Sequence, residues 1–154
     1  MEQGGFLMRL STKGRYATRA MLDLALHFDE GPILIKDISK RQEISKQYLE
    51  QLFIPLRAAG LVRATRGARG GFILAKPPSQ IKLSEIIRVM EGSASPVECL
   101  DDARICSRSD SCVTRGIWAE MKEAIDRVLG FTTLQDLVER QRGKEQAEVV
   151  TYQI

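Results

Sequence analysis

The segment 44–75 constrains the fold most, because an amphipathic helix pattern runs directly into a basic turn between two apolar runs. Ser45 can cap the helix by accepting from first-turn N–H groups. Gly60 follows the last apolar position, where a left-handed residue commonly ends a helix. The glycine-rich run 66–71 is a basic turn between two short strand patterns, which predicts a wing. The apolar helix positions recur at spacings of three and four: Tyr48, Leu49, Leu52, Phe53 and Leu56.

The residues before this segment predict two more helices. Ser11 or Thr12 can cap a first helix, and the range 35–41 has the pattern of a short second one. A short helix, a turn of three residues and a longer helix form the spacing of a helix-turn-helix. We therefore expect a mainly α fold with a small β wing, and a winged helix-turn-helix domain over 8–82.

The charge of the chain is divided between its two halves. Residues 1–82 carry 14 basic and 7 acidic side chains, whereas 83–154 carry 9 basic and 13 acidic ones. Between Gln51 and Ser84 there are six basic residues and no acidic one. Such a basic segment is typical of a surface that binds a polyanion. A solvated basic hairpin on an unrelated domain is the alternative, which the adjacent helix-turn-helix pattern disfavours.

The candidate DNA contacts follow from this arrangement. The outer face of the third helix carries side chains that can reach base edges, and the wing and the start of the first helix carry groups that suit phosphates. We expect no enzyme, because the single His27 is far in sequence from any cysteine and no catalytic constellation is visible. The candidates from the residue pattern are Arg9, Ser11, Ser45, Gln47, Glu50, Gln51, Arg66 and Arg69.

The second half predicts a dimerisation region over 83–140. A fourth helix spans 83–91, and a longer one spans 113–129 with an apolar stripe. Such a helix can bury its stripe against a second copy or against the first helix of its own chain. We favour a homodimer, because protein symmetry usually mirrors operator symmetry. The termini, 1–7 and 141–154, are expected to be flexible, with the last helix ending at Arg140.

Three cysteines, Cys99, Cys106 and Cys112, lie in a polar loop over 97–112. The N-terminus shows no signal-peptide pattern and no segment is apolar enough to span a membrane, so we expect a cytoplasmic protein. An odd number of cysteines there favours metal binding or a reactive thiol over disulfides. Thiolates suit an iron–sulfur cluster or zinc, and three unrelated thiols are the remaining alternative.

Several segments closely resemble a family of bacterial winged-helix transcription regulators that includes IscR, NsrR and CymR. They are MRLSTKGRYATRAML, ISKQYLEQLF, LRAAGLV and RGARGGFIL, and the likeness runs from Met8 to about Glu139. The resemblance implies a homodimer with one long crossing helix per subunit, bound to a pseudo-palindromic DNA operator. It also implies that Arg66 enters the minor groove. The residues implied to lie in the major groove are Gln47, Tyr48, Glu50 and Gln51.

The resemblance points in two directions for the cysteine loop. The residues after Cys112, VTRGIW, are similar to IscR, which implies an iron–sulfur cluster on Cys99, Cys106 and Cys112, of the 2Fe–2S rather than the 4Fe–4S type. The residues EGSASPVECLDD and TTLQDLV are similar to CymR, which implies a cluster-free regulator controlled by thiol oxidation or by a partner enzyme of sulfur metabolism. The fourth ligand is unassigned, because IscR's histidine falls on Arg115 and NsrR's acidic ligand on Arg15. The candidates on this chain are Glu98, Asp101, Asp102 and Asp110.

Overall fold

A computed structural model describes residues 10–153 of the chain. Within this range the fold is mainly helical with one two-stranded antiparallel sheet, as the sequence predicts. Val62 pairs with Leu74 and Thr65 with Gly71 in that sheet. The elements are α1 (Thr12–Leu26), α2 (Ile35–Gln42), α3 (Lys46–Ala58), β1 (Val62–Thr65), β2 (Gly71–Leu74), α4 (Leu83–Glu91), α5 (Val113–Phe131) and α6 (Leu134–Tyr152), with short 3-10 turns at Phe28–Glu30, Pro78–Gln80, Glu98–Leu100 and Ala103–Ile105.

The helix boundaries follow from local capping. The Ser11 hydroxyl accepts from the Gly14 N–H at 3.2 Å, and the Ser45 hydroxyl accepts from the Tyr48 N–H at 3.1 Å. Both bonds satisfy first-turn donors that have no partner inside the helix. Gly60 has φ 75°, the left-handed conformation expected after α3. The predicted starts of α1 and α3 and the end of α3 are therefore confirmed.

One apolar core joins α1, α2, α3 and α4 to the beginning of α6. Its largest fully buried side chains include Met21, Ile38, Leu49, Phe53 and Ile86. These residues come from helices that are far apart in sequence, so their burial fixes the helices relative to each other. Leu134 and Val138 of α6 are also in this core, which anchors the last helix to the first half of the chain.

The wing is attached to the core in two ways. The Phe72 ring of β2 stacks on Phe53 of α3, with centroids 4.4 Å apart and planes at 25°. Ile33, before α2, exchanges two backbone hydrogen bonds with Phe72, at 2.9 and 2.8 Å. Gly71 permits this approach, because a Cβ there would lie 2.4 Å from the Ile33 carbonyl oxygen. The wing is thus held against α3 and against the segment that precedes α2.

A buried carboxylate joins α1 to the end of α2. Asp23 is only 1% exposed, and the Arg41 Nε and Nη2 atoms donate to it at 2.9 and 2.7 Å. The Gln42 side-chain amide adds a third donor at 3.1 Å. This cluster fixes the end of α2 relative to α1, four residues before α3 begins. A buried charge needs such partners, and here they come from one helix end.

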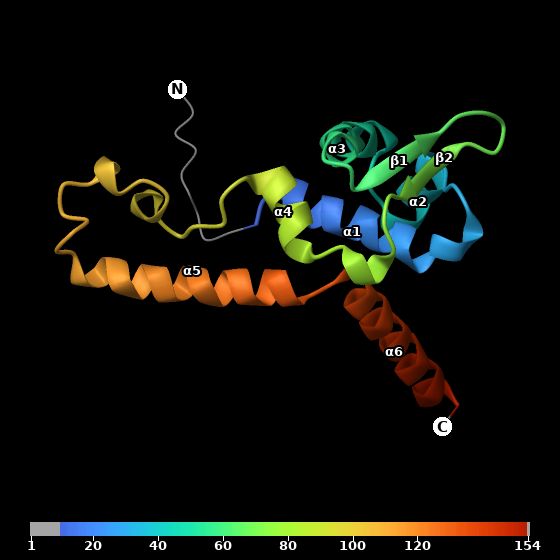
Figure 1. Cartoon of the computed structure of the whole chain (residues 1–154). Helices are drawn as coiled ribbons and strands as arrows, with labels where there is room; N and C mark the ends of the chain where they lie inside the picture. Colours follow the sequence, from blue (N-terminus) through green and yellow to red (C-terminus); the bar gives the residue numbers. More distant parts are fainter. Residues whose placement is uncertain (1–9, 154) are drawn as a thin grey trace.

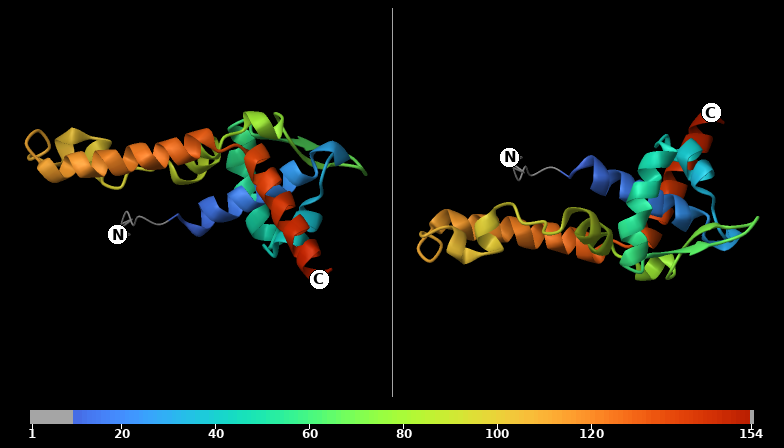
Figure 2. Two further views of the ribbon diagram at one scale, coloured as in Figure 1. Left: turned by 90° about the horizontal axis from the view of Figure 1, so that it is seen from below. Right: turned by 90° about the horizontal axis from the view of Figure 1, so that it is seen from above.

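The second half of the chain forms an arm. Figures 1 and 2 show α5 extending away from the helical body, with the segment that carries the cysteines beside its far end. None of the 19 residues of α5 is fully buried. The arm therefore exposes a helix that is amphipathic in sequence, which a single chain leaves partly uncovered.

The last helix is longer than the sequence pattern predicts. It continues beyond Arg140 to Tyr152, so the expected helix end was wrong. The residues 144–148 are Lys, Glu, Gln, Ala and Glu, which are good helix formers, and the Gln141 amide bonds Glu145 one turn later at 3.0 Å. A polar segment without an apolar stripe is as compatible with a solvated helix as with a flexible tail. Within residues 10–153 no helix is both long and apolar enough to cross a membrane.

Candidate nucleic-acid interface and cysteine loop

The α3 helix has one buried and one exposed face. Leu49, Leu52, Phe53 and Leu56 are 0–2% exposed and face the core. Figure 1 shows α3 and the wing at the same end of the body, on the side away from α6. The exposed residues of α3 therefore lie at the same end of the molecule as the wing. The exposed face carries the polar and charged side chains of Lys46, Gln47, Glu50, Gln51 and Arg57.

Two of the sequence candidates on α3 have local partners. The Ser45 hydroxyl serves as the N-cap, which leaves its proton available to an outside acceptor. Tyr48 is half-buried, and its ring meets the edge of Tyr16 with centroids 5.8 Å apart and planes at 84°. The Arg19 guanidinium lies 5.2 Å from the Tyr16 centroid. Tyr48 is therefore held by α1, a neighbour that spacing on α3 does not reveal.

The wing presents uncompensated positive charge. Arg66 and Arg69 are exposed in the turn between β1 and β2, and Arg57 and Arg63 are exposed nearby in the chain. In the described part of the chain, no carboxylate lies within ion-pair distance of these four arginines. Lys76 differs, because its ammonium is 3.0 Å from Glu85. At least one of the six basic residues between Gln51 and Ser84 is therefore neutralised by an ion pair, with an acidic residue that follows this segment in the sequence.

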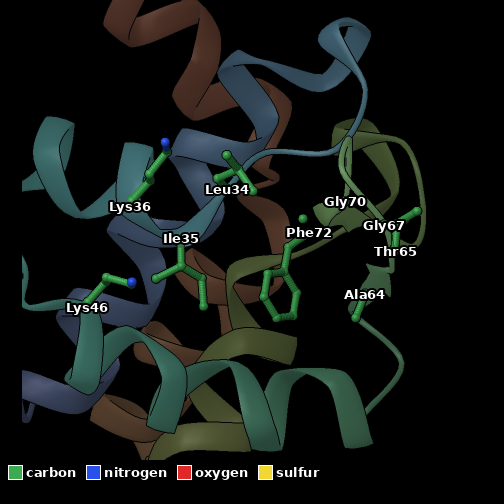
Figure 3. A pocket seen from close by; sticks show the side chains of 10 residues that line it. Leu34, Ile35, Lys36, Lys46, Ala64, Thr65, Gly67, Gly70 and Phe72 are labelled. Atoms are coloured by element: carbon green, nitrogen blue, oxygen red, sulfur yellow. The ribbon is translucent and has the colours of Figure 1, made fainter.

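A hollow of about 400 Å³ lies between the wing, the start of α2 and the start of α3. Figure 3 shows Ile35 and Phe72 at its centre, with Lys36 and Lys46 on one side and the wing residue Thr65 on the other. Its lining contains two lysines and no acidic residue. An apolar floor with cations at one side suits a group that combines hydrocarbon and negative charge. The lining residues are Leu34, Ile35, Lys36, Lys46, Ala64, Thr65, Gly67, Gly70, Gly71 and Phe72.

The start of α1 differs from the simple expectation of a phosphate contact. The Ser11 backbone N–H donates to the Glu91 carboxylate at 3.0 Å, and the Ser11 hydroxyl also donates to it. Glu91 ends α4, 80 residues away, so no local pattern could reveal it. Its negative charge occupies the helix N-terminus that would otherwise attract an anion. Arg9, the other candidate here, lies outside the described residues.

The three cysteines are free thiols on one loop. Cys99 lies in the turn Glu98–Leu100, Cys106 is exposed after the turn Ala103–Ile105, and Cys112 is the N-cap residue of α5. Within residues 10–153, no three side chains of His, Cys, Asp or Glu form a group that could hold a metal ion. The residue types suit a thiolate-bound metal, but this arrangement of the loop does not bring them together.

Cys112 lies beside polar groups at the start of α5. Its sulfur lies 3.1 Å from the Thr114 hydroxyl, and α5 begins at the next residue. The hydrogen bond from the Thr114 hydroxyl lowers the pKa of the Cys112 thiol, assisted by the Arg115 backbone N–H and the charge of Arg108. A lowered pKa enlarges the thiolate fraction at neutral pH, which favours both oxidation and metal ligation.

Other contacts tie the loop to its surroundings. Arg115 of α5 donates to the Cys99 carbonyl oxygen at 3.0 Å. Asp101 accepts from the hydroxyls of Ser93 and Ser95, at 2.9 and 2.6 Å. Arg104 forms an ion pair with Asp102 at 2.9 Å. Two of the carboxylates considered as a fourth ligand therefore already have partners, Asp101 in the preceding segment and Asp102 within the loop.

The α5 helix carries two apolar stripes with different exposure. Trp118, Met121, Ile125 and Leu129 are partly covered. The second stripe is open, with Val113 88%, Ile117 53%, Val128 63% and Phe131 81% exposed. At 100° per residue these four positions fall on one side of the helix. Val113 and Ile117 lie near the start of α5 and Val128 and Phe131 near its end, with Glu120 between the two pairs on the same side. Exposed apolar pairs that share one side of a helix are typical of a surface that another protein covers.

Comparisons with known proteins agree with this architecture. Residues 10–140 match the family model described as "Rrf2: Iron-dependent Transcriptional regulator". The regulator CymR of Bacillus subtilis is 43% identical over 140 residues, covering 91% of this chain and 96% of CymR. The regulator IscR of Xenorhabdus nematophila is 43% identical over 141 residues, covering 92% of this chain and 85% of IscR.

Solved structures of both kinds of regulator have the same fold. The B. subtilis CymR structure has a TM-score of 0.75 at 42% identity and covers 87% of this chain and 98% of its own. The T. potens IscR structure has a TM-score of 0.73 at 45% identity, and the match covers 86% of this chain and 88% of the IscR chain. These relatives are transcription regulators, and the match spans both the winged half and the arm. The chain belongs to the Rrf2 family of transcriptional regulators.

Proposed function

We propose that this protein is a homodimeric transcription regulator that binds a pseudo-palindromic DNA operator in the cytoplasm. The observation that carries the proposal is the open polar face of α3 beside a wing whose arginines have no carboxylate partner in the described chain. A helix fits the major groove, where side chains such as Gln47 and Gln51 can form hydrogen bonds with base edges. The wing then meets the adjacent minor groove, with Arg66 at its tip.

The hollow between α3 and the wing supports this docking. One sugar–phosphate strand separates a major groove from the neighbouring minor groove. If α3 occupies one groove and the wing the other, that strand has to cross the space between them. Lys36 and Lys46 provide positive charge there, and Ile35 and Phe72 provide apolar surface for deoxyribose. We propose these two lysines as phosphate contacts that fix the register without reading sequence.

The open stripe of α5 supports the homodimer. A second copy has the same apolar stripe, and two-fold pairing of identical helices covers both at once. Two recognition helices then face two half-sites with the same symmetry. In the described single chain α5 packs mainly on α4 and on the turn Glu98–Leu100, not on α1, and Val113, Ile117, Val128 and Phe131 remain open.

The test is a selection of duplexes from a randomised library by the purified protein. We expect enrichment of one motif with two inverted half-sites, bound far more tightly than its scrambled version. Arg66→Ala should weaken binding and reduce the slope of log affinity against log salt by about one per lost phosphate contact. Arg88→Ala is the matched control, because Arg88 is exposed on α4, away from the wing. Absence of any enriched motif would refute the proposed function.

We propose in addition that the cysteine loop is the sensing element. The likeness to IscR supports an iron–sulfur cluster on Cys99, Cys106 and Cys112, and the likeness to CymR supports control by thiol oxidation or by a partner enzyme. Binding a cluster requires the loop to close, since the thiols are not gathered in the described arrangement. The polar surroundings of Cys112 support thiol oxidation without such a movement.

Anaerobic purification separates these possibilities. Visible absorbance with stoichiometric iron and sulfide, lost in Cys106→Ala, would establish the cluster. A colourless protein whose DNA affinity changes with oxidant, and no longer does so in Cys112→Ser, would favour thiol control. Zinc in place of iron and sulfide would indicate a structural zinc site in the loop. DNA binding unaffected by metal removal, reconstitution and oxidant would refute a sensing role for the loop.

A further inference from the structure

One apolar side chain lies at the centre of the open face of α3. Ile54 is 70% exposed, whereas Leu49, Leu52, Phe53 and Leu56 are at most 2% exposed. At 100° per residue, Ile54 points away from the middle of that buried group. Its exposure is therefore fixed by the packing of the helix, and no rotation of α3 can hide Ile54 without exposing the core.

The neighbours of Ile54 on this face are polar. Gln47, Glu50, Gln51 and Arg57 lie within one or two turns and are all exposed. A single exposed aliphatic side chain is common on protein surfaces and has no meaning by itself. Its position matters here, because it interrupts the surface that we propose to meet base edges. Few groups in a major groove can form a favourable contact with an aliphatic side chain such as Ile54.

The major-groove edges of the bases carry hydrogen-bond donors and acceptors, with one exception. The C5-methyl group of thymine is their only apolar group. An aliphatic side chain set against any other base edge leaves a donor or acceptor unpaired and removed from water, which is unfavourable. We infer that Ile54 is a specificity residue that selects an A·T pair in each half-site by packing on the thymine methyl. This inference rests on the proposed DNA-binding function.

The rise of the helix places this pair relative to the others. Ile54 is three residues beyond Gln51, or roughly 4.5 Å along the helix axis, and seven beyond Gln47, or roughly 10 Å. Stacked bases are about 3.4 Å apart. The selected thymine is thus expected about one base step beyond the pair met by Gln51, on the side away from the start of α3. Packing on a deoxyribose is the competing contact, and it carries no preference for sequence.

Replacement of thymine by deoxyuridine tests the inference, because it removes only the methyl group. The probe is the best duplex from the selection described above, with each thymine replaced in turn, symmetrically in both half-sites. For the wild-type protein we expect one position at which affinity falls about fourfold per half-site. This factor corresponds to the free energy lost when one buried methyl group is no longer removed from water. The same replacement should have no effect on Ile54→Ala, and Ile54→Val, which keeps a branched side chain, should retain most of it.

A change in stability should not account for a change in DNA affinity, because Ile54 is outside the core. Both variants should therefore unfold at the wild-type temperature. Deoxyuridine effects below about 1.5-fold at every position, or an effect equally large in Ile54→Ala, would overturn the inference. If no duplex is enriched at all, the proposed function fails and the inference with it. Enrichment without coupling between Ile54 and a thymine methyl overturns only the role of Ile54.

Discussion

Removal of the Arg41 side chain should destabilise the DNA-binding half by leaving Asp23 buried without its charged partner. Asp23 is 1% exposed and receives two hydrogen bonds from Arg41, with one more from Gln42. Breaking a fully buried ion pair from one side costs about 3–5 kcal/mol. Because the Arg41 side chain is 38% exposed and Gln42 remains as a donor, we expect about 2–3 kcal/mol for Arg41→Ala.

Urea unfolding followed by circular dichroism measures this loss, with the protein concentration held fixed because dimerisation contributes to the apparent stability. Arg88→Ala is the control and should change the free energy of unfolding by less than about 0.5 kcal/mol. The double variant Asp23→Ala with Arg41→Ala should be less destabilised than the sum of the single variants, by about 1 kcal/mol or more. A loss below about 1 kcal/mol for Arg41→Ala, or simple additivity, would refute the argument.

Three further predictions concern the two proposed interfaces and the cysteine loop. Glu50→Ala should relax the base preference at one position of each half-site, because a carboxylate can accept from cytosine but repels most other groups; repeating the duplex selection measures this, and loss of binding to every duplex would contradict the placement of Glu50. Ile117→Glu should weaken dimerisation about 100-fold or more, because it sets a charge in the apolar stripe, whereas Glu123→Gln, exposed on another side of α5, should leave dimerisation unchanged; analytical ultracentrifugation measures the dimer dissociation constant, and an unchanged constant for Ile117→Glu would show that α5 is not in the interface. Thr114→Val should slow alkylation of Cys112 by iodoacetamide at pH 7, because loss of the hydroxyl hydrogen bond raises the pKa of the thiol and reduces the thiolate fraction, whereas Thr114→Ser should keep the wild-type rate; equal rates in all three proteins, measured by mass spectrometry, would contradict this account.

Local patterns predicted most of the fold. The caps at Ser11 and Ser45, the left-handed Gly60 and the basic turn 66–71 each depend on residues within one or two turns. Because such features are written in short stretches of sequence, the residue pattern alone places the helix-turn-helix and the wing. The end of the last helix could not be placed in this way, because a polar helix without an apolar stripe gives no periodic signal.

Contacts between residues that are far apart in the chain could not be predicted from the sequence. Glu91 at the start of α1 and Glu85 beside Lys76 change the local charge, and both depend on how α4 packs. The pairing of Asp23 with Arg41 left one trace, an acidic residue inside the apolar run 21–26. An acidic residue in an apolar run indicates that its carboxylate has a buried partner, but it does not show which residue that partner is. The conformation of the cysteine loop was likewise beyond reach, because the number and spacing of cysteines do not say which side chains the loop brings together.

Hydroxyl-radical footprinting of the selected duplex tests the central claim most directly, since it reports which sugars the bound protein covers. A dimer with α3 in the major groove and the wing in the adjacent minor groove should protect two segments on each strand, related by two-fold symmetry and separated by about one helical turn or a multiple of it. Arg66→Ala should remove the protection at the minor-groove sugars and leave the rest. A single protected segment, or uniform weak protection that does not depend on the motif, would contradict a two-fold symmetric regulator that reads sequence through α3.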